Sequence, residues 1–277
     1  MRKLSRRIAA GLVVATVATV SGCGSSGGLK PHAQVRAVDV GTNVVTPSNI
    51  DTATVLVNGG ASYEQVPYSS PSRYLFLESG GSSFQASTTM ALPQITYPIG
   101  YNGNTTVTTG PTPLPITTLN LVDGGSYTAL LVGRPDVPAP LPDLSDLDPR
   151  YLKVVVLTDN QVAPTAGHAT VRAMSAVADP SRPALDIYVS GQGTASPIFT
   201  NVPFATQAAV ATADQSLVAG TVTVSANIAG TATVILPPTT VTLPAGKETL
   251  VITEPTGDNT TVTPPTVTTY GVAVLSN

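Results

Sequence analysis

The residues with the most evident capacity for chemistry stand near the start of the chain. Residues 24–28 fit the pattern of a nucleophilic serine between glycines, and residues 22–27 fit the glycine pattern of a dinucleotide-binding loop. Both patterns work only where a strand leads into a helix, because that geometry exposes the serine or cradles the phosphates. Neither stretch follows a strand or opens a helix, so we interpret this region as a flexible Gly/Ser spacer.

The first 22 residues predict a secretory signal peptide. Basic side chains begin the segment, and apolar and small residues follow over residues 8–20. This run is too short to cross a bilayer core of about 30 Å as a helix. We therefore expect residues 1–22 to be removed on export. The basic side chains are Arg2, Lys3, Arg6 and Arg7.

Cys23, the only cysteine of the chain, is predicted to carry the lipid of a bacterial lipoprotein. Val20, Ser21 and Gly22 precede it and complete a lipobox, in which the cysteine thiol receives diacylglycerol before the signal is cleaved. Two or three acyl chains give stable anchoring, whereas one gives only reversible binding. The expected location is the extracytoplasmic side of the cell envelope, with residues 23–31 as the tether. In a Gram-negative cell this is the outer membrane or periplasmic face.

The charge balance argues against nucleic acid as a partner. Cleavage removes four of the 13 basic side chains and leaves all 16 acidic ones, so the mature chain has a net charge of about −7. An acidic chain gains nothing from displacing the counterions of phosphates, and an anionic lipid surface does not attract it. The predicted membrane contact is therefore the lipid on Cys23.

His32 and His168, the only histidines, are the next candidates for metal or base chemistry. Each stands alone, whereas a zinc site needs several ligands within reach. We interpret both as exposed rings or strand-edge hydrogen-bonding groups, with a metal or general-base role as the weaker alternative. Residues 143–148 contain three aspartates but lack the glycine and distal glutamate of an EF-hand loop, so they are interpreted as a solvated loop. No metal, cofactor or catalytic residue is predicted.

Arg36 and Arg172 lie among small and apolar residues. An arginine in such a strand usually lays its stem on the sheet and pairs its head with a carboxylate. Asp51 and Asp186 are the suggested partners. An anion-binding role is the alternative.

These arginines belong to an internal repeat, which sets the organisation of the chain. Residues 32–37 read HAQVRA and residues 168–173 read HATVRA, and later turns and strands recur in the same order. We predict two copies, at residues 32–160 and 168–277, joined by a linker at residues 161–167. Each copy has its own set of strands and is expected to fold alone.

Composition and pattern predict that both copies are β-sandwiches. Charged residues make up 10% of the chain, and 24 glycines and 25 prolines stand among many β-branched residues. This composition is typical of short strands between tight turns. Asn58 and Gly59 follow an apolar run and predict a two-residue hairpin turn. About seven strands per copy predict an all-β fold of two tandem immunoglobulin-like antiparallel sandwiches.

Four segments of the second copy follow the pattern of a known family. They are ATVRA at residues 169–173, PALDIYV at 183–189, FTNVPF at 199–204 and AGK at 245–247. In these segments the chain resembles the DUF4397 domain of bacterial envelope proteins. It departs from the family at residues 174–180, which read MSAVADP where the family has HASPDAP. The resemblance implies an immunoglobulin-like sandwich in an extracytoplasmic setting, and it implies no active site.

Residues 85–118 are rich in Thr, Pro, Gly and Asn and exceed the corresponding stretch of the second copy in length. Long loops on rigid sandwiches often carry recognition. Tyr97 and Tyr101 lie inside this segment and are the candidate contacts for an envelope protein or surface ligand. The alternative is an insertion that the surface merely tolerates.

The sequence therefore predicts a membrane-anchored lipoprotein that serves as a non-catalytic binding, adhesion or structural module of the cell envelope. An enzyme would need a cluster of titratable groups, and none is evident from the sequence. A carbohydrate-binding protein usually presents aromatic platforms, whereas this chain has no tryptophan and 5% aromatic residues. An envelope hydrolase or a carbohydrate-binding protein is the alternative.

Overall fold

The computed structural model describes residues 31–41, 53–63, 66, 68–88, 96–98, 106–108, 115–134, 150–159, 163–179, 182, 184–190, 196–208, 215–259 and 266–276. These residues form 18 strands and no helix, so none of them belongs to a helix able to cross a membrane. The predicted all-β sandwich fold is confirmed. The predicted signal peptide, the lipobox and Cys23 lie outside the described residues.

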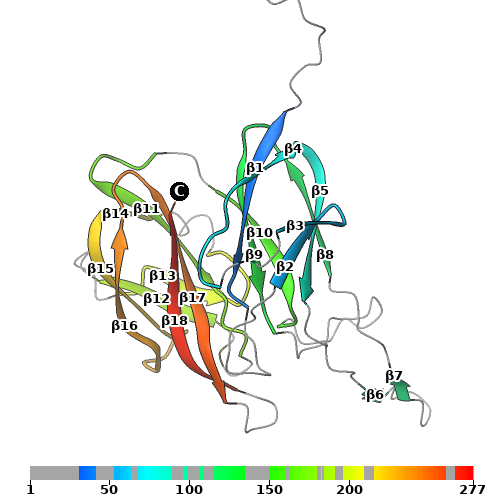
Figure 1. Cartoon of the computed structure of the whole chain (residues 1–277). Helices are drawn as coiled ribbons and strands as arrows, with labels where there is room; N and C mark the ends of the chain where they lie inside the picture. Colours follow the sequence, from blue (N-terminus) through cyan, green and yellow to red (C-terminus); the bar gives the residue numbers. More distant parts are fainter. Residues whose placement is uncertain are drawn as a thin grey trace, which may run out of the picture. The chain divides into compact units, whose positions relative to one another are not determined.

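The first part of the chain, residues 31–159 and called copy one below, forms two four-stranded sheets (Figure 1). One has the order β10-β9-β1-β4 and the other β3-β2-β5-β8, and β6 and β7 pair separately. All pairings are antiparallel except that of β1 with β9. The strands are β1 (His32–Asp39), β2 (Ala53–Val57), β3 (Gly60–Tyr63), β4 (Leu75–Glu78), β5 (Gly80–Thr88), β6 (Thr96–Pro98), β7 (Thr106–Thr108), β8 (Ile116–Leu121), β9 (Ser126–Val132) and β10 (Lys153–Thr158).

The second part, residues 163–276 and called copy two below, also forms two four-stranded sheets. Their orders are β14-β11-β17-β18 and β13-β12-β15-β16. Again one pairing is parallel, that of β11 with β17. The strands are β11 (His168–Ser175), β12 (Ala184–Ser190), β13 (Phe199–Pro203), β14 (Gln215–Val218), β15 (Gly220–Ile228), β16 (Val234–Leu243), β17 (Glu248–Asn259) and β18 (Thr266–Ser276).

The strand pairings of copy one recur in copy two. β1 pairs with β4 and β9 as β11 pairs with β14 and β17. The turn that leads from one sheet to the other also recurs, between β8 and β9 and between β16 and β17. In the first the Gly124 N–H donates to the His32 carbonyl, and in the second the Gly246 N–H donates to the His168 carbonyl. Both glycines have a left-handed φ, of 69° and 73°. The sequence repeat is thus a repeat of strand topology, while the predicted limits of the copies and of the linker stay predictions.

The predicted hairpin turn at Asn58 and Gly59 is present. Val57 pairs with Gly60, and the two residues between them have φ values of 52° and 76°. Positive φ at both central residues is the signature of a type I′ turn, which matches the twist of the flanking strands. This turn joins β2 to β3.

Each copy buries one core between its two sheets. In copy one, alternate residues of β1 point into this core, namely Ala33, Val35 and Ala37. Phe84 of β5 faces them from the other sheet and is fully buried. In copy two, Ala169, Val171 and Ala173 of β11 take the same positions as the β1 residues.

A third apolar cluster contains residues of both copies. Val38 and Leu130 of copy one belong to it together with Met174 and Ile252 of copy two, and all four are fully buried. These residues lie on the strand faces that point away from the two sandwich cores. The β1 and β11 sheets are therefore apolar on both faces, and residues 31–277 form one compact unit.

The loop predicted at residues 85–118 is shorter than expected, because both ends of this segment belong to strands. Gln85 lies inside β5 and pairs with Ile116 of β8. Phe84 and Ala86 on either side of it are buried, so the strand continues past the residue at which the loop was predicted to begin. Within the segment, Tyr97 of β6 pairs with Val107 of β7.

Candidate functional site

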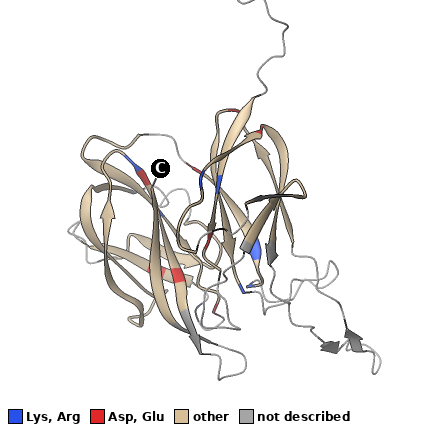
Figure 2. Ribbon diagram, viewed as in Figure 1, with Lys and Arg blue, Asp and Glu red and all other residues tan. Residues whose placement is uncertain are grey.

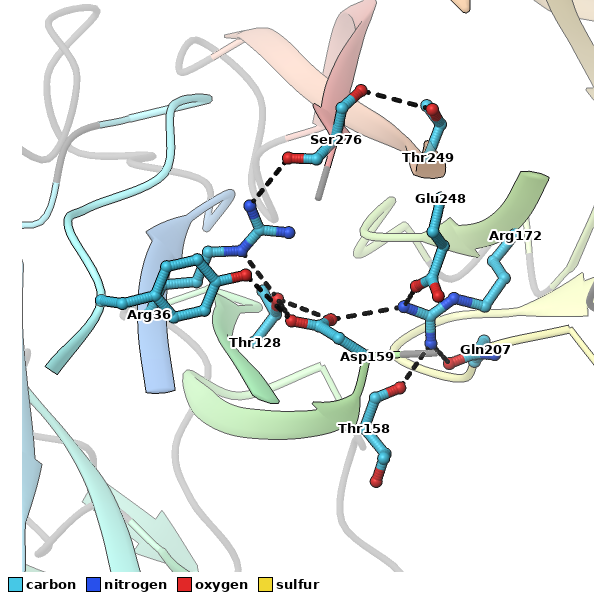
Figure 3. A network of polar contacts seen from close by, with 10 residues as sticks. Arg36, Thr128, Thr158, Asp159, Arg172, Gln207, Glu248, Thr249 and Ser276 are labelled. Atoms are coloured by element: carbon cyan, nitrogen blue, oxygen red, sulfur yellow. Dashed lines mark hydrogen bonds and ion pairs between the residues drawn. The ribbon is translucent and has the colours of Figure 1, made fainter. Parts of the chain in front are cut away.

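A reciprocal contact between the repeated arginines joins the two copies. Arg36 of β1 donates through Nη1 to the backbone carbonyl of Ser276, at 3.2 Å, in the last strand of copy two. Arg172 of β11 donates through Nη1 to the backbone carbonyl of Thr158, at 2.7 Å, in the last strand of copy one. Each arginine thus reaches from its own copy to the end of the other (Figure 3).

Thr158 and Ser276 occupy equivalent positions in the two copies. Thr158 pairs with Tyr127, which lies opposite Val35. Ser276 pairs with Thr249, which lies opposite Val171. Val35 and Val171 each directly precede the repeated arginine, so the two contacts are related by an approximate twofold symmetry.

The same symmetry holds in the third apolar cluster. Val38 and Met174 stand two residues after the respective arginines, and Leu130 and Ile252 lie opposite them in the parallel strand. Side chains at equivalent positions therefore pack together from the two copies. An interface of this kind is self-complementary, as between the subunits of a twofold dimer.

Arg172 also pairs with two buried carboxylates. Its Nη2 donates to Glu248 of β17 and to Asp159 Oδ1, which lies 3.3 Å away at the end of copy one. The Gln207 side chain accepts a further bond of 3.1 Å from Nη1. Because these four residues combine one cation with two anions and an amide, the arginine is held by charge as well as by hydrogen bonds.

Arg36 has uncharged partners in its immediate surroundings. Its Nε donates to Thr128 Oγ1 at 3.0 Å, and its guanidinium lies 5.2 Å from the centre of the Tyr74 ring. The Thr128 hydroxyl in turn donates to Asp159, at 2.9 Å. Thr128 therefore links the two arginines through one carboxylate.

This network, defined as Arg36, Thr128, Asp159, Arg172 and Glu248, is buried and carries no net charge. Its four ionisable side chains are 3% or 4% exposed, and two cations balance two anions. Elsewhere in the described strands, charged residues are few and far apart (Figure 2). Burial of charge is tolerated where pairing and hydrogen bonds replace water, and in this network they do so for most groups, although Arg172 Nε has no hydrogen-bond partner among the described residues.

A second polar contact between the copies lies at the turn after the Val-Pro-Tyr sequence. The Tyr68 hydroxyl donates to the Pro255 carbonyl, and the Ser69 hydroxyl donates to Glu254 Oε1 at 2.7 Å. Glu254 is 3% exposed, and burial raises the pKa of its carboxyl to about 7 although the Ser69 bond opposes this. Its second oxygen, Oε2, has no hydrogen-bond partner among the described residues.

Asp39 is a further buried acid, at the end of β1. Burial raises the pKa of its carboxyl to about 8, the Gly41 N–H opposes this by donating to Oδ1 at 2.9 Å, and the negative charge of Glu254 adds to the rise. Burial by the surrounding residues is therefore the main reason why both carboxyls bind a proton more tightly than usual. Neither carboxyl is accessible to a substrate in solution, because their residues are 0% and 3% exposed.

The prediction that an arginine of this repeat pairs with a carboxylate is confirmed for Arg172, but Asp186 is not its partner. Asp186 accepts hydrogen bonds from the backbone N–H groups of Asn201 and Gly230, at 2.9 and 2.8 Å, and so is engaged within copy two. Asp51 lies outside the described residues. Arg172 pairs instead with Glu248 of its own copy and with Asp159 of copy one, and the second of these partners is defined only where the two copies meet.

The histidines are the first residues of β1 and β11. His32 is exposed, and its backbone N–H donates to Asp123 Oδ1 at 3.0 Å. His168 Nδ1 lies 3.2 Å from the Ala166 carbonyl. Among the described residues, no group of three or more His, Cys, Asp or Glu could hold a metal ion. Tyr101 and residues 143–148 lie outside the described part of the chain.

Sequence reasoning missed Asp159 and Glu248, although a signal for them existed. Asp159 directly follows the apolar strand β10, and Glu248 is the first residue of the apolar strand β17, so each is an acid at one end of an apolar strand. Comparison with protein-family models gives no match, and comparison with curated proteins gives none either. The resemblance to the DUF4397 domain accordingly stays a hypothesis.

Proposed function

We propose that this protein is a lipid-anchored, non-catalytic module of the cell envelope whose two copies act as one rigid body. The lipobox ending at Cys23 supports the anchor. The reciprocal arginine contact supports the rigid body, because the copies share an apolar cluster and a buried charge network. Such a body can present its outer sheet faces and loops on the extracytoplasmic side of a membrane.

The placement of the charged groups carries this proposal. The acids whose pKa departs most from the ordinary value, Asp39 and Glu254, are buried where strands pack together. Catalytic acids and bases must reach a substrate, and groups in this position do not. A binding, adhesive or structural role uses the surface and leaves these groups in place.

Metabolic labelling with palmitate tests the anchor. The mature protein is expected to incorporate label and to partition with membranes, whereas Cys23→Ala is expected to lose both properties. Ser25→Ala, two residues away in the spacer, is the matched control and should be labelled normally. Label retained by Cys23→Ala would contradict the proposal.

A further inference from the structure

An open hollow lies on the sheet of copy one that faces away from β1. It has a volume of about 440 Å³ and is shallow and largely open to solvent. Three neighbouring parts of the β3-β2-β5-β8 sheet form it: the hairpin turn after β2, the start of β5 and the end of β8. The lining residues are Asn58, Gly81, Ser82, Ser83, Thr118, Leu119 and Asn120.

The sheet geometry explains why this surface is hollow and polar. Ser82 and Phe84 of β5 are buried, so the positions that alternate with them, Gly81 and Ser83, face outward. Gly81 has no side chain, and a methyl group built there would meet no atom within 4 Å. Thr118 and Asn120 are the exposed positions of β8 beside it.

The groups around the hollow are amides and hydroxyls without charge. Asn58 is held in place because its Oδ1 accepts the Ser83 N–H at 2.9 Å, which fixes the amide at the rim. Asn120, Thr118 and Ser83 add further donors and acceptors. The described residues that line the hollow are all uncharged, so they offer no opposite charge to phosphate, carboxylate or ammonium groups.

Copy two provides an internal comparison for this surface. Gly80 pairs with Leu121 as Gly220 pairs with Leu243, which aligns Gly81 with Thr221. The same register aligns Asn120 with Thr242. Copy two therefore presents threonines at the two positions where copy one has the open space and an amide.

We propose that this hollow binds one neutral sugar unit of an envelope glycan. A sugar ring offers several hydroxyls and no charge, which matches amides and hydroxyls spaced over two strands and a turn. This proposal rests on the proposed function, since it names the ligand of a module held in the envelope. It requires no aromatic platform, so hydrogen bonds provide the recognition.

The test uses the full mature chain with Cys23→Ala, labelled with ¹⁵N and titrated with glucose, galactose, mannose, N-acetylglucosamine and N-acetylgalactosamine. At least one sugar is expected to shift the side-chain amide signals of Asn58 and Asn120 in a saturable manner. Gly81→Thr, which copies Thr221, should weaken that affinity by roughly tenfold or more, because it fills the space and displaces hydrogen bonds. Thr221→Gly in copy two is the matched control and should leave the affinity unchanged.

Two results would overturn the sugar site. One is the absence of saturable shifts at Asn58 and Asn120 with every sugar, including when short peptides produce them instead. The other is an affinity that Gly81→Thr leaves unchanged. Either result leaves the palmitate labelling of Cys23 untouched, so failure of the ligand and failure of the anchor are distinguishable.

Discussion

Arg36 and Arg172 occupy the same place in the two copies and make the same bond to the other copy, yet their remaining partners differ. Arg36 meets a hydroxyl and an aromatic ring, whereas Arg172 meets Asp159 and Glu248. Glu248 pairs with Thr170 where copy one pairs Ser126 with Gln34, so the two surroundings diverged at equivalent positions. Both arginines donate to a backbone carbonyl in the last strand of the other copy, but only Arg172 also pairs with carboxylates among the described residues.

The largest expected effect comes from removing the ion pairs of Arg172. Arg172→Met leaves Asp159 and Glu248 buried without their cation, so the free energy of unfolding should fall by about 3–5 kcal/mol. Arg36→Met leaves a hydroxyl and a carbonyl unpaired and should cost about 1–3 kcal/mol. Urea unfolding of both variants measures the difference. Equal losses would show that the carboxylates add nothing to the Arg172 contact.

The free energy of unfolding should depend on pH through the second contact between the copies, that of Ser69 with Glu254. The pKa of Glu254 rises from 4.5 to about 7 on folding, so the folded protein keeps a proton that the unfolded chain releases. This contribution to stability is complete below pH 4.5 and is lost as the pH rises through 7. Asp39 acts in the same direction, from 3.8 to about 8.

Stability should therefore decline between about pH 5 and 8, by at most about 1.4 kcal/mol per pH unit for each group. Glu254→Gln should flatten the part due to that residue. Ser69→Ala removes the hydrogen bond that lowers the pKa of Glu254, so it should extend the decline to higher pH. Urea midpoints measured across this range provide the test, and an unchanged slope in Glu254→Gln would refute the role of Glu254.

A smaller effect is expected at the link between the arginines. Thr128→Val keeps the shape of the side chain but removes the hydroxyl that connects Arg36 to Asp159. The expected loss is about 1–3 kcal/mol, because a buried donor and a buried acceptor each lose a partner. Thr221→Val, at an exposed position of copy two, is the control and should change the unfolding free energy by less than about 0.5 kcal/mol. Similar values for the two variants would mean that Thr128 does not link the arginines.

The smallest effect is expected at the repeated histidines. His32→Ala removes an exposed ring, and its backbone bond to Asp123 does not depend on the side chain. The change in unfolding free energy should stay within about 0.5 kcal/mol. A loss of several kcal/mol, or a loss of bound metal from the purified protein, would contradict the interpretation of the histidines as edge residues.

The sequence predicted the strands and the Asn58-Gly59 turn because their signals are local. It did not predict the contact between the copies, because the partners of Arg36 and Arg172 are defined only when two sheets meet face to face. A signal was present in β9, where Leu130, Leu131 and Val132 follow one another without a polar residue. Continuous apolar runs indicate burial on both faces of a sheet. The sugar hollow could not be predicted, since it depends on which residues of two strands and a turn lie side by side.

The central claim is that the two copies unfold as one unit. The sequence led to the expectation that residues 168–277 fold alone, whereas the shared apolar cluster and the buried network predict cooperative unfolding of the pair. Differential scanning calorimetry of the mature chain tests this most directly. We predict a single transition whose calorimetric enthalpy equals the van't Hoff enthalpy. Two separate transitions, or a calorimetric enthalpy near twice the van't Hoff value, would contradict the account.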